Sequence, residues 1–109
     1  MTTATTLTHH LEAILQTDVD AIMSDYTETS VLVTPNGRLE GLAAIRGFFT
    51  QFIANSPPEL LKAMTLTHQE VTGEIAYIIW TAEPFIPFAS DTFLIRDDSI
   101  VVQTGTLAS

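Results

Sequence analysis

The sequence contains no cysteine and few basic residues. Without cysteine, neither a disulfide framework nor a thiolate metal site or nucleophile is available, and nothing opposes an intracellular location. Only 4 Lys and Arg stand against 13 Asp and Glu, which gives a formal net charge of −9 at pH 7. A charge of this sign repels phosphate backbones and anionic lipid surfaces, so we expect neither nucleic acid nor a membrane as a partner.

Long apolar runs are also missing. No window approaches the roughly 18 apolar residues that a membrane-spanning helix needs, and the first ten residues, MTTATTLTHH, lack the basic and apolar regions of a secretory signal. We therefore expect a cytoplasmic protein. With 109 residues and 46% hydrophobic content, the chain can bury one core but not two, which predicts a single domain spanning residues 1–109.

Apolar residues recur every three or four positions in three segments of the N-terminal half, which predicts amphipathic helices over 6–16, 19–26 and 42–54. Asp18 is the expected N-cap of the second helix. The sequence SVLVT (30–34) predicts a strand, and PNGR after it contains the Asn-Gly pair that favours a hairpin.

The C-terminal half is rich in β-branched and aromatic residues, which predicts four consecutive strands over 60–73, 74–85, 88–97 and 99–108. The expected fold class is therefore α+β, with three N-terminal helices packed on one face of a curved, mainly antiparallel sheet.

The stretch EIAYIIWTA (74–82) is apolar on both of its alternating faces. Helices can cover only one face of the sheet, so a second copy of the chain is the simplest cover for the other. We therefore expect a homodimer through the outer face of the sheet. We expect Ile79 to point inward, toward the helices. Because neighbouring side chains of a strand alternate, Trp80 should then point outward and belong to that interface.

Asp91 stands on a strand face that is otherwise apolar. Alternation places its side chain with Phe93 and Ile95, which favour burial. A carboxyl group that faces an apolar cavity should have a raised pKa and could then donate a proton or a hydrogen bond. The plainer alternative is a solvated Asp91 at the end of the strand, or one that caps a backbone amide.

Three stretches, DVDAIMSDYTETSVLVTPNG, LEGLAAIRGFFTQFI and DTFLIRDDSIVVQT, resemble the nuclear transport factor 2-like superfamily and, within it, the SnoaL-like and ketosteroid-isomerase-like proteins. The resemblance covers roughly residues 7–107 and implies a cone-shaped, cystatin-like fold. Families with this fold include isomerases, cyclases, epoxide hydrolases and modules that only bind or associate, so the fold does not decide the function.

The isomerase's catalytic residues carry over only in part. Thr34 takes the place of its general base, and an alcohol cannot take up a proton near neutral pH. Leu11 takes the place of the tyrosine that binds the oxyanion, whereas Asp91 matches the second donor, an aspartic acid that stays protonated. We therefore expect no ketosteroid isomerase activity.

Further candidates are side chains expected around Asp91. Gln103 resembles a pocket position of the family and offers an amide, Tyr26 offers a hydroxyl group, and His10 is a candidate proton carrier. Their plainer alternatives are a solvated polar face, a core tyrosine and a surface histidine. Thr34 completes the polar set, and the expected apolar walls are Phe48, Phe52, Ile79 and Leu107.

No histidine spacing typical of metal ligands occurs, so we expect no metal, and nothing in the sequence implies a cofactor. Two kinds of function remain open for a cavity that takes a small, largely apolar molecule. One is acid–base isomerisation or hydrolysis, with Asp91 and His10 as catalytic residues. The other is ligand binding, or dimerisation and association, without catalysis.

Overall fold

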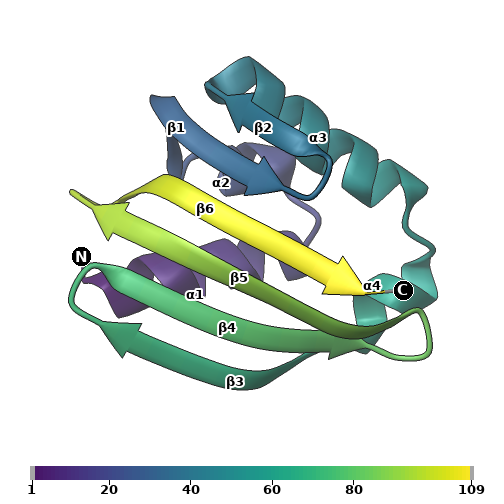
Figure 1. The fold of residues 1–109 in the computed structure, drawn as a ribbon. Helices are drawn as coiled ribbons and strands as arrows, with labels where there is room; N and C mark the ends of the chain where they lie inside the picture. Colours follow the sequence, from purple (N-terminus) through teal and green to yellow (C-terminus); the bar gives the residue numbers. More distant parts are fainter. Residues whose placement is uncertain (1, 109) are drawn as a thin grey trace.

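The computed structural model describes residues 2–108. The strands form one six-stranded sheet in the order β2-β1-β6-β5-β4-β3, and the helices lie on one of its faces (Figure 1). Neighbouring strands are antiparallel except β1 and β6, which run parallel. The predicted α+β class with a mainly antiparallel sheet is therefore confirmed. The elements are α1 (Thr3–Leu15), α2 (Val19–Met23), β1 (Tyr26–Thr34), β2 (Gly37–Glu40), α3 (Leu42–Asn55), α4 (Pro58–Ala63), β3 (Met64–Thr72), β4 (Ile75–Ala82), β5 (Ile86–Arg96) and β6 (Ser99–Ala108).

The first two helices begin at side-chain caps. Thr2 accepts a hydrogen bond from the Thr5 backbone N–H at 3.1 Å, and Thr5 accepts one from the Thr2 N–H at 2.8 Å, so α1 begins earlier than its apolar stripe. Asp18 caps α2 as predicted, since it accepts from the Ala21 N–H at 3.1 Å.

Tyr26 is the first residue of β1, which corrects its prediction as the last residue of the second helix. Tyr26 pairs with Ile100 of β6, and the Ile100 N–H donates to the carbonyl oxygen of Asp25 at 2.7 Å. Pairing with a strand far along the chain therefore outweighs the local helical periodicity.

A fourth helix, α4, occupies residues 58–63, where we predicted the beginning of a strand. Pro57 is its N-cap and Pro58 its first residue, a position that suits proline because no intrahelical N–H bond is needed there. Leu60 then packs with Ala82, Ile86 and other residues of a small apolar cluster.

Two-residue turns close the β1–β2 hairpin at one edge of the sheet and the β5–β6 hairpin in its middle. Thr34 lies opposite Gly37 across Pro35 and Asn36, so Gly37 is already the first residue of β2. The β5–β6 hairpin turns at Asp97 and Asp98, whose φ angles of +52° and +64° suit the twist of the paired strands. A break between strands was predicted here, between 88–97 and 99–108.

The main core lies between the sheet and helices α1, α2 and α3, and none of the helices formed by residues 2–108 covers the opposite face of the sheet (Figure 1). No helix among residues 2–108 is both long and apolar enough to cross a membrane. The largest core side chains, each at most 2% exposed, are Leu7, Ile22, Leu32, Ile45, Ile78, Phe93 and Ile100.

The orientation of β4 corrects two predictions. Ile78 lies directly opposite Asp91 of β5, so Ile78 and Trp80 share its face and turn toward the helices. Ile79 therefore lies on the outer face, and the prediction that Trp80 belongs to a dimer interface is wrong. Because both alternating sets of β4 are apolar, only its register with β5 decides which set is inside.

Candidate functional site

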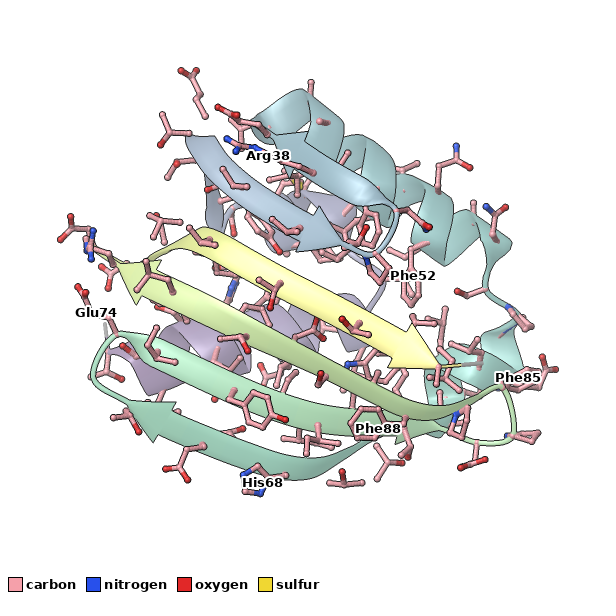
Figure 2. The ribbon with its side chains drawn as sticks, viewed as in Figure 1. Arg38, Phe52, His68, Glu74, Phe85 and Phe88 are labelled. Carbon is pink, nitrogen blue, oxygen red and sulfur yellow. The ribbon has the colours of Figure 1, made fainter. Side chains whose placement is uncertain are left out.

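A cavity of about 380 Å³ lies between the inner face of the sheet and helices α1 and α3. Phe52 reaches from α3 toward the sheet and forms part of its wall (Figure 2). The cavity is open to solvent, because Leu15, Leu66 and Leu107 at its rim are 56%, 44% and 47% exposed. The lining residues are Leu11, Ile14, Leu15, Leu32, Thr34, Pro35, Asn36, Phe48, Phe49, Phe52, Met64, Thr65, Leu66, Ile78, Trp80, Asp91, Phe93, Gln103, Gly105, Thr106 and Leu107.

Asp91 is the one titratable side chain in the lining that residues 2–108 form. The Trp80 Nε1–H donates to Asp91 Oδ2 at 2.9 Å, and the Gln103 amide lies near enough to act on the pKa of Asp91 as a second hydrogen-bonding group. Burial raises the pKa of Asp91, although Trp80, Gln103 and the nearby His10 act in the opposite direction. The result is a half-buried carboxyl group that is suited to exchange a proton with a bound molecule.

Gly105 makes room for this carboxyl group. It lies directly opposite Asp91 in the β5–β6 pair, and a Cβ atom at this position would overlap Asp91 Oδ1. Glycine inside a strand is a signal of close approach, and this signal could have identified Gly105 from the sequence.

His10 and Tyr26 are fully buried behind the wall of the cavity and are not part of its lining. Tyr26 donates a short hydrogen bond from its hydroxyl group to Gln103 Oε1, and His10 Nε2 lies 3.3 Å from the same hydroxyl group. Burial, followed by the charges of Asp91 and Asp25, raises the pKa of Tyr26 well above its ordinary value. Tyr26 is therefore a neutral hydroxyl group that touches Gln103 rather than a ligand.

Asp25 extends this set toward the surface. It is 3% exposed, lies 3.3 Å from His10 Nδ1, and has both carboxylate oxygens 2.9 Å from Nδ1 of His9. The side chain of His9 is 45% exposed. Sequence reasoning missed Asp25, although its position directly before Tyr26 was a signal once Tyr26 had been singled out.

The structure brings most of the predicted site residues together. Ile79 is outside the lining because it faces the other side of the sheet, and the surface alternative for His10 is wrong because the residue is 0% exposed. The predicted residues that do line the cavity are Thr34, Phe48, Phe52, Asp91, Gln103 and Leu107.

The cavity carries no positive side chain within residues 2–108. The three arginines of the chain form exposed ion pairs elsewhere: Arg38 with Glu40, Arg46 with Asp20 and Arg96 with Glu74. The described residues also bring together no group of three or more His, Cys, Asp or Glu side chains that could hold a metal ion.

A family model described as the SnoaL-like domain matches residues 7–102 of the chain. The comparison with curated proteins gave no match.

Solved structures share the fold at low sequence identity. A nuclear transport factor 2-like protein of unknown function from Burkholderia xenovorans is 14% identical with a TM-score of 0.79, covering 98% of this chain and 83% of its own. A proposed polyketide cyclase from Sinorhizobium meliloti is 18% identical with a TM-score of 0.74, covering 92% of each chain. A proposed ketosteroid isomerase from Kribbella flavida is 13% identical with a TM-score of 0.74, covering 98% of this chain and 78% of its own. These likenesses show a nuclear transport factor 2-like fold.

Proposed function

The chain belongs to the SnoaL-like domain family, and from this premise we propose that it binds a small, uncharged and largely apolar molecule with which Asp91 exchanges a proton. The observation that carries the proposal is the position of Asp91 at the polar end of an apolar cavity, held by Trp80 and Gln103. A ligand in this cavity would meet one carboxyl group and few other polar side chains.

The charge of the ligand follows from the lining. An anionic ligand would lie near Asp91 without a Lys or Arg side chain to balance its charge, in a chain of net charge −9. Placing two like charges in an apolar cavity is costly. A neutral molecule with a carbonyl or hydroxyl group avoids this cost and can take part in the exchange of a proton.

The proposed chemistry is proton transfer at a carbon next to a carbonyl group. The carboxylate of Asp91 takes the proton, an enolate forms, and the acid form of Asp91 returns a proton to the same or another atom. The names of two structural neighbours, polyketide cyclase and ketosteroid isomerase, support an enzyme, although their 18% and 13% identities indicate only the fold. Thr34 and Leu11 replace the isomerase's base and oxyanion donor, so we do not propose its reaction.

The test uses two matched probes, neutral 2-acetylnaphthalene and anionic 2-naphthoate, followed by the NMR signal of the Trp80 indole N–H. Trp80 is the only tryptophan of the chain, and its N–H contacts Asp91 at the cavity. We expect the ketone to shift this signal with a saturable dependence on its concentration. It should also bind about ten-fold or more tightly than the acid, a difference of about 1.4 kcal/mol or more in binding free energy. If neither probe moves the Trp80 signal, the binding proposal is wrong.

Proton transfer is tested on the bound ketone by exchange of its methyl protons in D₂O. The unaltered protein should accelerate this exchange, and Asp91→Asn should abolish the acceleration while the ketone still binds. Binding without exchange would instead support a ligand-binding module without catalysis. The presence of a single titratable side chain in the lining favours that second candidate.

We further propose that the protein is a cytoplasmic homodimer that joins through the outer face of the sheet. Apart from Arg96 at the end of β5, the outward side chains of β4, β5 and β6 are apolar or neutral, and Phe88 lies on this face as well (Figure 2). Two copies of a chain with net charge −9 can meet there with few charged side chains between them, since Glu70, opposite Tyr77, lies at the margin of this surface. We call this surface the outer patch: Ile75, Tyr77, Ile79, Phe88, Ser90, Thr92, Leu94, Val102 and Thr104.

A further inference from the structure

A path of polar side chains connects Asp91 in the cavity with the buried carboxyl group of Asp25. From Asp91 it passes through Gln103 of β6 to the hydroxyl group of Tyr26 on β1, and from there to His10 of α1. His10 Nδ1 then lies 3.3 Å from Asp25 Oδ2. Four elements of the fold therefore hold one continuous polar path through the core.

The ring of His10 is fixed in this path. It is 0% exposed, and three aromatic rings meet it edge to face or nearly so, with centroids 5.4 Å away at Tyr26, 5.9 Å at Phe49 and 5.7 Å at Phe93. Each ring nitrogen consequently has one polar neighbour, Asp25 at Nδ1 and Tyr26 at Nε2. The titratable groups that face His10 are Asp25 and Tyr26 by contact and Asp91 through its charge; α3 faces it with Phe49.

The hydroxyl group of Tyr26 has a single proton, so the direction of its hydrogen bond constrains the directions of the others along the path. If both nitrogens of His10 carry protons, Nε2–H donates to the Tyr26 oxygen, and Tyr26 donates to Gln103 Oε1. The NH₂ group of Gln103 then faces Asp91 and donates to its carboxylate. This arrangement matches the hydrogen bonds of the structure.

The opposite arrangement follows when His10 has lost the proton on Nε2. Tyr26 then donates to that nitrogen, so the Gln103 amide rotates by half a turn and its NH₂ group donates to the Tyr26 oxygen. The carbonyl group of Gln103 now faces Asp91 and accepts the proton of its carboxylic acid form. The two arrangements hold the same number of protons, one of which has left His10 Nε2 and one of which has been gained by Asp91.

We propose that His10, acting through Tyr26 and the orientation of the Gln103 amide, determines whether Asp91 meets a hydrogen-bond donor or an acceptor. His10, Tyr26 and Gln103 are thus positioning residues: a protonated His10 favours the carboxylate of Asp91, and a neutral His10 favours its acid form. This coupling gives the cavity a second titratable group, which its lining lacks. The inference rests on the proposed function only where it assumes that Asp91 exchanges its proton with a bound molecule.

The test is a ¹⁵N NMR measurement of the His10 ring at neutral pH without any ligand, so its result is independent of whether a ligand binds. We expect Asp91→Asn to move the His10 Nε2 signal toward that of an unprotonated nitrogen, although the two residues are separated by Tyr26 and Gln103. In a Gln103→Met background most of this shift should disappear. Gln51→Met, the same substitution on the exposed side of α3, is the matched control and should leave the shift intact.

Tyr26→Phe provides a second way to interrupt the polar path, by removing one oxygen atom, in case Gln103→Met does not fold. It should also remove most of the response of His10 to Asp91→Asn. The proposal is overturned if Asp91→Asn leaves the His10 signals unchanged in the folded protein. It is also overturned if the response is equally large in the Gln103→Met or Tyr26→Phe background, since the two groups would then interact through space alone.

Discussion

Among single residues, Asp91 links the stability of the fold to the chemistry of the cavity. Its pKa is raised by burial, so the folded state binds the Asp91 proton more tightly than the unfolded state does. The contribution of Asp91 to stability is therefore most favourable at low pH, where the group is protonated in both states. A penalty develops as the pH rises from the ordinary pKa of 3.8 to the folded pKa, because the unfolded state loses the proton first, and it is complete above the folded pKa.

Asp91→Asn should accordingly raise the midpoint of thermal unfolding at pH 7, because an amide carries no charge to desolvate. The difference between the variant and the unaltered protein should shrink as the pH falls from the folded pKa of Asp91 toward its ordinary value of 3.8. Calorimetry over a pH series, together with NMR titration of the Asp91 carboxyl carbon, measures both quantities. A carboxyl pKa at or below 3.8, or a destabilised variant at pH 7, would contradict this account.

Between elements, the close approach of β5 and β6 depends on the absence of a side chain at Gly105. A Cβ atom there would overlap Asp91 Oδ1, and the carboxyl group is held on its other side by the Trp80 indole N–H at 2.9 Å. Either the Asp91 side chain must turn away from Trp80, or the two strands must separate.

Gly105→Ala should therefore lower the free energy of unfolding by about 1–3 kcal/mol, the usual cost of an overpacked interior site. In a background that already carries Asp91→Ala, the same change should cost much less because the overlapping atoms are gone. Chemical denaturation of the two single variants and the double variant forms a complete double-mutant cycle. Equal costs in both backgrounds would show that Gly105 is needed for another reason.

At the scale of the whole molecule, charge is distributed unevenly. The acidic residues that give the net charge of −9 avoid the outer patch. Glu70 of β3, opposite Tyr77, lies at the margin of the patch. A patch without charged side chains on a highly charged chain is where self-association costs least electrostatically.

The unaltered protein should therefore scatter light as a dimer, with twice the 11.9 kDa of one chain, at micromolar concentration. Ile79→Asp should give monomers, because each protomer would bury an unpaired carboxylate at a cost of several kcal/mol. Gln51→Glu changes the net charge by the same amount on the exposed side of α3 and should leave the dimer intact. A monomeric unaltered protein, or equal dissociation of both variants, would refute the interface.

The sequence alone determined the features that depend on neighbours along the chain. The helical stripes, the cap at Asp18 and the acidic turn at 97–98 were predictable because periodicity, capping and turn chemistry are local. The shared inner face of Asp91 and Phe93 was predictable for the same reason, since alternation within one strand needs no partner.

Only the tertiary structure decided which side chains of different elements meet. The two faces of β4 are equally apolar, so the position of Trp80 beside Asp91 followed from pairing with β5. Tyr26 lies in a strand and not in the predicted helix, because it pairs with Ile100, 74 residues later in the chain. The path from Asp91 through Gln103 and Tyr26 to His10 joins strands and a helix that are remote in sequence, and such contacts are fixed by strand register and packing rather than by any local pattern.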